Sequence, residues 1–199
     1  MRVAERYFRG NVAVDEKVLG ANHPDHAKTL NNLARTLIEQ QRYREAAPLL
    51  ERAIAIAEPE RGEAHDTMAF FYSNLAIARR HMGRFTEAET LFEKAIAAAR
   101  ATGHRSLGPS LADLAELRCA SGQVREGLAL LHAAKRATAA DYPDRPWRSA
   151  WVENIRGLCL VRSGNVVEGR AAIARSTPVI TAEWPAGTLF AAEAKARMR

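Results

Sequence analysis

The sequence predicts an all-α fold built from repeated helix pairs. Only eight prolines occur among 199 residues, alanine is abundant, and runs of β-branched residues are almost absent. Apolar side chains recur three and four residues apart, which is the spacing of one helix face. Much of the chain also matches itself at an offset of 42 residues. Internal repeats of this length are typical of helical solenoids.

The composition excludes several classes of protein. Hydrophobic residues make up 47% of the chain and charged residues 26%, which is ordinary for a folded domain and excludes global disorder. The longest apolar runs are too short to span a bilayer, and Met1 is not followed by a stretch of signal-peptide length, so we expect a cytoplasmic location. The two cysteines, Cys119 and Cys159, fit buried thiols in a reducing compartment better than a disulfide framework.

The repeat is clearest where LNNLA in residues 30–34 aligns with YSNLA in residues 72–76. The same offset aligns His23 with His65, while a third copy follows at 39 residues and a weaker fourth returns to 42. Each copy has the pattern of two helices. Small residues stand where these helices must approach closely, namely Ala34, Ala46, Ala76, Ala88, Ala115 and Gly157.

These residues resemble the tetratricopeptide repeat, a helix-turn-helix unit with small and large apolar positions. The length of 42 residues, with VLGANHPD at 18–25 leading into LNNLA, is similar to the kinesin light chain type and its bacterial relatives. The resemblance is sharp over residues 4–100 and looser from 146 onward. It implies a right-handed solenoid of antiparallel helix pairs with a C-terminal capping helix.

The expected organisation is one solenoid domain over residues 1–199. Its parts are the second helix of an incomplete repeat at 1–20, repeats at 21–60, 61–102 and 103–140, a degenerate repeat at 146–182, and the capping helix at 186–199.

The first helix is expected to lack a neighbour on one side. Its apolar residues are expected to cover Leu30, Leu33 and Leu37; they are Val3, Tyr7, Phe8, Val12, Val14 and Val18. The other side is then exposed, covered by a second copy of the protein, or left bare by truncation of a longer protein.

No motif for catalysis or for a cofactor is found. The patterns of serine hydrolases, P-loops, dinucleotide-binding loops and zinc proteases are all missing from the sequence, so we expect a non-enzyme with no cofactor and no metal. His23 and His26 have a spacing that can bind a metal, but His23, His65 and His104 recur at one place in the repeat. A structural role there, such as capping a helix start, is the better interpretation.

The resemblance places polar residues of each first helix along a concave groove that holds extended peptides. An asparagine amide both donates and accepts, so it can bind a peptide backbone. The candidate groove residues are Lys28, Asn31, Asn32, Arg35, Phe70, Asn74, Ile77, His81, Asp113, Glu116 and Asn154. Their charges favour a ligand that is acidic over the first unit.

The function expected from this resemblance is binding of a protein or peptide partner, without catalysis. The net charge of +6, with 24 arginines among 29 basic residues, leaves a nucleic-acid-binding or regulatory solenoid as an alternative. That alternative is disfavoured because the arginines are scattered and Asp113 and Glu116 would repel phosphate. Self-association through residues 1–20 is a further alternative, and no membrane partner is expected.

Overall fold

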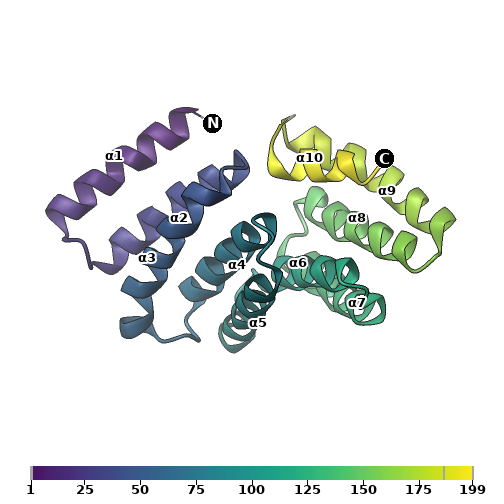
Figure 1. Ribbon diagram of the computed structural model, residues 1–199, viewed down its shortest axis with the longest axis horizontal. Helices are drawn as coiled ribbons and strands as arrows, with labels where there is room; N and C mark the ends of the chain where they lie inside the picture. The colour runs from purple at the N-terminus through teal and green to yellow at the C-terminus, as the bar shows by residue number, and fades with distance from the viewer. Residues whose placement is uncertain (1, 186, 199) are drawn as a thin grey trace. The chain divides into compact units, whose positions relative to one another are not determined.

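The computed structural model describes residues 2–185 and 187–198, and this part of the chain consists of helices joined by short turns (Figure 1). It contains ten α-helices and no strand, which confirms the all-α prediction. Residues 1, 186 and 199 lie outside the described part, so the ends of the predicted segments 1–20 and 186–199 are described only in part.

The helices fall into two compact units, residues 1–104 and residues 105–199. The first unit contains α1 (Arg2–Val18), α2 (Pro24–Glu39), α3 (Tyr43–Arg61), α4 (Asp66–His81) and α5 (Phe85–Thr102). The second contains α6 (Leu107–Ala120), α7 (Val124–Asp141), α8 (Pro146–Arg162), α9 (Val166–Glu183) and α10 (Leu189–Ala196).

Consecutive helices pack as hairpins within each unit. In unit 1, α2 packs on α3 and α4 on α5, while α3 and α2 also contact α4. In unit 2, α6 pairs with α7 and α8 with α9, and α10 packs on α9 and α8. This pairwise, consecutive packing is the arrangement of a helical solenoid.

Small side chains let the paired helices of unit 1 approach closely. Ala34, Ala46, Ala76 and Ala88 are all completely buried. Around them the core of unit 1 is filled by large apolar side chains, including Leu30, Met68, Phe71 and Tyr72. The repeating small and large positions in the sequence therefore correspond to buried positions in these helix pairs.

The starts of α2 and α4 explain the repeated histidines. Nδ1 of His23 accepts a hydrogen bond of 3.1 Å from the backbone N–H of Asp25, and Nδ1 of His65 accepts one of 3.2 Å from Thr67. These bonds satisfy N–H groups that have no partner within the helix. His104 differs, because α6 begins only at Leu107.

The turn within each helix pair requires a residue whose backbone adopts the left-handed conformation, with positive φ. Gly83 and Gly122 have φ values of 78° and 87° there. At the corresponding turn after α2 the residue is Gln41, with φ of 61°, the one non-glycine residue of positive φ in the described part of the chain. Side chains other than glycine adopt this conformation at a cost.

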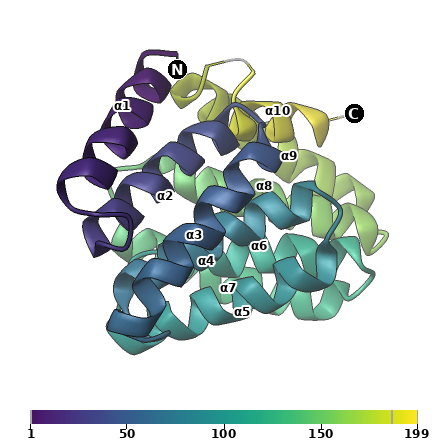
Figure 2. The ribbon, with the colours of Figure 1, turned by 60° about the vertical axis from the view of Figure 1, so that its left-hand side comes forward.

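The first helix packs differently from the prediction. Phe8 and Val12 are half-buried, and Val12 packs against the core of unit 1, where α1 lies beside α2 (Figures 1 and 2). Val3, Tyr7, Val14 and Val18 are 56% to 74% exposed. The expectation that all six cover α2 was wrong because, at 100° per residue, these four lie on the opposite face of the helix.

The prediction of free thiols was also wrong. Cys119 of α6 and Cys159 of α8 are joined by a disulfide with a Cα–Cα distance of 5.4 Å. The packing of α6 on α8 brings together two residues that the sequence separates by 40 positions. The cysteines therefore no longer support a reducing compartment. Among the helices of residues 2–185 and 187–198, none has the length and apolar character needed to cross a membrane.

Candidate functional site

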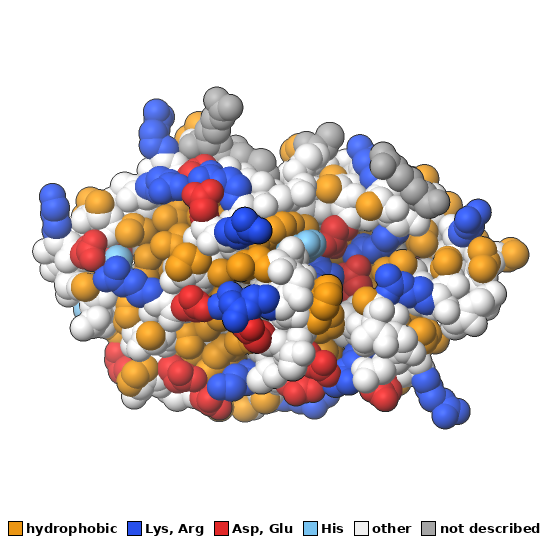
Figure 3. All heavy atoms as spheres, in the orientation of Figure 1, with side chains coloured by type: hydrophobic (Ala, Val, Ile, Leu, Met, Phe, Trp, Pro, Cys, Tyr) orange, Lys and Arg blue, Asp and Glu red, His pale blue; other side chains and the backbone are white. Residues whose placement is uncertain are grey.

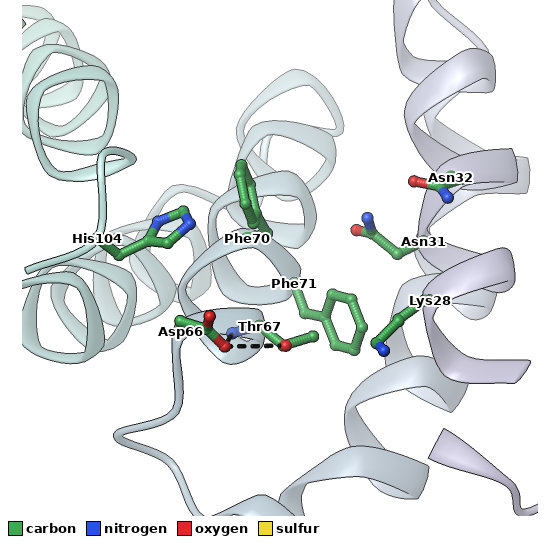
Figure 4. A pocket seen from close by; sticks show the side chains of 8 residues that line it. All are labelled: Lys28, Asn31, Asn32, Asp66, Thr67, Phe70, Phe71 and His104. Carbon is green, nitrogen blue, oxygen red and sulfur yellow. Dashed lines mark hydrogen bonds between the residues drawn. The ribbon is translucent and has the colours of Figure 1, made fainter. Parts of the chain in front are cut away.

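Unit 1 contains an open cavity of about 250 Å³ between α2 and α4 (Figure 4). Lys28, Asn31 and Asn32 come from α2, and His104 follows α5. The remaining lining residues belong to α4; they are Asp66, Thr67, Phe70 and Phe71. The cavity thus joins segments from three parts of the unit.

An aromatic wall forms one side of this cavity. Phe70 is 39% exposed, which is unusual for a large apolar side chain on a helix otherwise packed into the core. Its ring meets the ring of His104 edge to face, with the centroids 4.5 Å apart. Phe71 is buried beneath. Part of the Phe70 ring is therefore exposed to the cavity, where an apolar group of a ligand can contact it.

Two asparagines connect α2 to α4 near the cavity. Nδ2 of Asn74 donates a hydrogen bond of 2.8 Å to Oδ1 of Asn31. Asn31 is 8% exposed and Asn74 is half-buried. This bond holds the two side-chain amides in place. It uses the oxygen of Asn31 and the nitrogen of Asn74, and does not use the nitrogen of Asn31 or the oxygen of Asn74.

Charges of both signs border the cavity. Nζ of Lys28 donates to Asp25 at 2.8 Å, and the same ammonium group holds the pKa of the Asp25 carboxyl below its usual range. At the opposite side, Asp66 accepts hydrogen bonds of 2.6 and 3.1 Å from the backbone N–H and hydroxyl of Thr67. Asn32 is exposed on α2.

Four of the predicted groove residues line this cavity, namely Lys28, Asn31, Asn32 and Phe70. Arg35 is exposed one turn further along α2 and pairs with Glu39 at 3.3 Å. Ile77 is half-buried on α4. His81 stacks on Tyr43 with the centroids 4.3 Å apart and lines a second cavity, of about 330 Å³, at the other end of α4.

The predicted groove residues of unit 2 are buried. Asp113 and Glu116 of α6 are 7% and 9% exposed, and Asn154 of α8 is fully covered. Glu116 and Asn154 both bind the side chain of Arg197, which follows α10. The expectation that they line an open groove needs correction, because all three side chains are buried and Arg197 covers Glu116 and Asn154.

The sequence did not identify Asp66, Thr67 and His104 as lining residues. His104 carries a signal, since it recurs in the repeat with His23 and His65, but that recurrence predicts a structural role and not a place in a cavity. Only the tertiary structure reveals that its ring lies against Phe70. Asp66 and Thr67 begin α4, where their proximity to α2 depends on how the helices pack.

The surface over unit 1 is apolar between charged borders. In Figure 3, hydrophobic side chains line a hollow on the side of the molecule where Figure 1 shows α2 to α4, and lysines, arginines and acidic residues surround it. No group of three or more histidine, cysteine and acidic side chains suited to a metal ion occurs among the residues that the structure describes.

Paired helices with an open, partly apolar cavity define a helical-repeat protein with the surface of an interaction scaffold. The sequence matches the profile of the tetratricopeptide repeat over residues 1–58 and 67–131, more than half of the chain. The chain belongs to the tetratricopeptide repeat family. The family and its fold indicate a scaffold for protein–protein interaction.

Solved structures share the fold. A Podosopora anserina protein of nearly identical TPR-like repeats, named after kinesin light chain, has a TM-score of 0.67 and 23% identity, covering 93% of this chain and 89% of its own. BtubC (BKLC) from P. vanneervenii has a TM-score of 0.72 and 19% identity, covering 92% and 74%. These likenesses show that the chain shares the fold expected from the resemblance to the kinesin light chain type.

A Rap protein complexed with competence and sporulation factor is a more distant likeness. Its TM-score is 0.65 and its identity 15%, covering 98% of this chain and 56% of the Rap chain. Comparison with curated protein sequences finds no match.

Proposed function

We propose that unit 1 binds an extended peptide segment of a partner protein in the cavity between α2 and α4, without catalysing a reaction. The observation that carries this proposal is the cavity itself, in which the partly exposed ring of Phe70 stands beside the amides of α2. An apolar contact next to convergent polar groups is the usual composition of a ligand site.

The asparagines would provide the polar contacts. Asn32 is exposed on α2, so its amide can both donate to and accept from a peptide backbone. The hydrogen bond from Asn74 to Asn31 restricts both side chains before any ligand arrives. Such preorganisation reduces the entropy that binding must overcome. A ligand side chain would then contact Phe70.

Capture of partners from a lysate of the source cell, after nuclease treatment, tests this proposal. The wild-type chain is compared with Phe70→Ala and with Asn32→Ala/Asn74→Ala. Phe85→Ala is the matched control, because Phe85 is 57% exposed on α5 and does not line the cavity. Circular dichroism verifies that each variant is folded.

The expected result is one or more proteins retained by wild type and Phe85→Ala and lost with both cavity variants. Peptides scanned from the captured protein should then bind wild type and lose at least ten-fold in affinity with Phe70→Ala, about 1.4 kcal/mol. Equal capture by all four chains would contradict the proposal. Capture of nucleic acid alone, before nuclease, would favour the nucleic-acid alternative.

A second candidate, self-association, is supported by the exposed face of α1. Val3, Tyr7, Val14 and Val18 form an apolar stripe along one side of that helix. Such a stripe is usually covered by another element. A concentration-dependent mass in light scattering that Tyr7→Glu abolishes would support it, whereas a constant monomer mass would contradict it. The cytoplasmic location stays a proposal that the disulfide does not favour.

A further inference from the structure

The guanidinium of Arg197 lies in a nearly closed site within unit 2. Its side chain is only 6% exposed. Nη1 donates a hydrogen bond of 3.0 Å to Oδ1 of Asn154, and Nη2 bonds to the carboxylate of Glu116. The guanidinium carbon also lies 4.4 Å from the centroid of the Trp151 ring. A carboxylate, an amide oxygen and an aromatic face thus surround one cation.

These three groups belong to the body of unit 2. Glu116 is on α6, and Trp151 and Asn154 are one turn apart on α8. The Asn154 amide is fixed by α9, because its Nδ2 donates to the hydroxyls of Ser176 and Thr177 at 2.8 and 3.1 Å. Its oxygen therefore points to the guanidinium in a defined direction. Trp151 also contacts α10, because its ring packs edge to face against Phe190 with the centroids 5.0 Å apart.

The cation comes from the segment that follows the last helix of unit 2. Arg197 directly follows the eight-residue helix α10. That helix is anchored by its buried residues Leu189, Ala191 and Ala194, all on the N-terminal side of Arg197. Glu193 of α10 also bonds to the guanidinium, at 3.1 Å. The Arg197 side chain can therefore swing out while the apolar contacts of α10 persist.

We propose that Glu116, Trp151 and Asn154 form an arginine-binding subsite, which Arg197 fills in the free protein and which an arginine of a partner protein takes over by exchange. This subsite lies in unit 2 and is independent of the cavity proposed for unit 1. The partner is a protein segment that presents one accessible arginine to helices α6 and α8.

Exchange of one arginine for another avoids the main electrostatic obstacle. Glu116 is 9% exposed, and a buried carboxylate without a cation is strongly destabilising. An incoming guanidinium restores that pair and the contact with the ring. Lysine is a poor substitute, because a planar guanidinium can bond to two acceptors and stack on an aromatic face at the same time.

Arg197 acts as a tethered competitor in this scheme. An intramolecular group has a high effective concentration, so Arg197 competes strongly for the subsite. The apparent affinity for an external arginine is the intrinsic affinity multiplied by the fraction of time that the subsite is open. Removing the competitor should therefore strengthen binding even though no new contact is made. This outcome separates a ligand site from an ordinary internal ion pair.

The test is an NMR titration of full-length protein with Nα-acetyl-arginine amide, following the indole N–H signal of Trp151. Nα-acetyl-lysine amide is the control probe. The chains are wild type, Arg197→Ala, Arg197→Lys and Arg197→Ala/Glu116→Gln. Arg197→Lys keeps the positive charge near Glu116, so it serves if Arg197→Ala folds poorly. The spectrum of the Trp151→Phe variant assigns the Trp151 indole N–H signal, because that signal is missing from it.

Arg197→Ala and Arg197→Lys should bind the arginine probe at least ten-fold more tightly than wild type. The lysine probe should not saturate, and Arg197→Ala/Glu116→Gln should lose the gain. In wild type, the arginine probe should also shift the side-chain Nε signal of Arg197 toward its solvent-exposed position. Equal binding to wild type and both Arg197 variants, or an Arg197 signal that does not move while the probe binds, would overturn the proposal.

Discussion

Gly157 of α8 and Gly169 of α9 face each other so closely that neither position has room for a side chain. A Cβ atom added to Gly157 would lie 2.7 Å from the carbonyl oxygen of Gly169, and one added to Gly169 would lie 2.6 Å from that of Gly157. The α8–α9 pair of unit 2 therefore depends on two glycines, where the α2–α3 and α4–α5 pairs bury alanines such as Ala46 and Ala88.

We expect Gly157→Ala to destabilise unit 2 by about 2 kcal/mol, because the backbone of α9 would have to move away. Urea unfolding followed by tryptophan fluorescence measures this effect. All three tryptophans, Trp147, Trp151 and Trp184, belong to unit 2, so the signal reports on that unit.

Gly10→Ala, measured by circular dichroism, is the matched control for Gly157→Ala. A Cβ at Gly10 meets nothing within 4 Å. Glycine is a poor helix former, so this substitution should be neutral or stabilising by up to about 1 kcal/mol. An unchanged midpoint for Gly157→Ala would show that the α8–α9 contact is looser than described.

The disulfide between Cys119 and Cys159 should stabilise unit 2. It closes a segment of 40 residues, and the loss of freedom in the unfolded chain for a loop of that length corresponds to about 4 kcal/mol. Cys119→Ser/Cys159→Ser, or full reduction, should lower the unfolding midpoint by fluorescence. Thiol titration of the denatured, unreduced protein should find no reactive thiol. Two reactive thiols would show that the bond does not form.

The attachment of α1 should weaken in acid. Glu5 accepts hydrogen bonds from Arg42 at 2.8 Å and from Arg9 at 3.0 Å, and these two arginines hold the pKa of its carboxyl below the ordinary value of 4.5. A lowered pKa in the folded state contributes stability above pH 4.5 that is lost as the pH falls through the folded pKa.

Hydrogen exchange of α1 amides, corrected for intrinsic rates, measures this effect between about pH 7 and about pH 3, a range that spans the ordinary carboxyl pKa. Protection of α1 should fall on acidification before that of α4. Glu5→Gln should reduce protection at neutral pH and remove most of the pH dependence. Protection of α1 that is equal at both pH values in wild type would contradict the role of Glu5.

Replacing Gln41 with glycine should stabilise unit 1. Gln41 has φ of 61°, and glycine at this position removes a conformational cost of about 1 kcal/mol. Gln40→Gly is the control, because φ at Gln40 is −89°, where glycine only adds freedom to the unfolded chain. The midpoint temperature of thermal unfolding, followed by circular dichroism, should rise for Gln41→Gly and fall for Gln40→Gly. A shift in the same direction for both would contradict this account.

The helical architecture and the family were predictable because both follow from local spacing. Apolar positions three and four residues apart predict helices, and the 42-residue offset predicts that successive pairs look alike. Lys28, Asn31, Asn32 and Phe70 were all predicted as groove residues, and these four line one cavity. Their role in binding stays a prediction, as does the division of the chain into repeats.

By itself the sequence determined the fold class, the family and the buried small positions of the first two helix pairs. Only the tertiary structure decided which polar groups stay accessible and which side chains bind one another. Asn74 meets Asn31, Cys119 meets Cys159, and Arg197 covers Glu116, and each pair joins positions at least 40 residues apart. The physical reason is that a repeat pattern reports the face on which a residue lies. What packs over that face depends on distant segments of the chain.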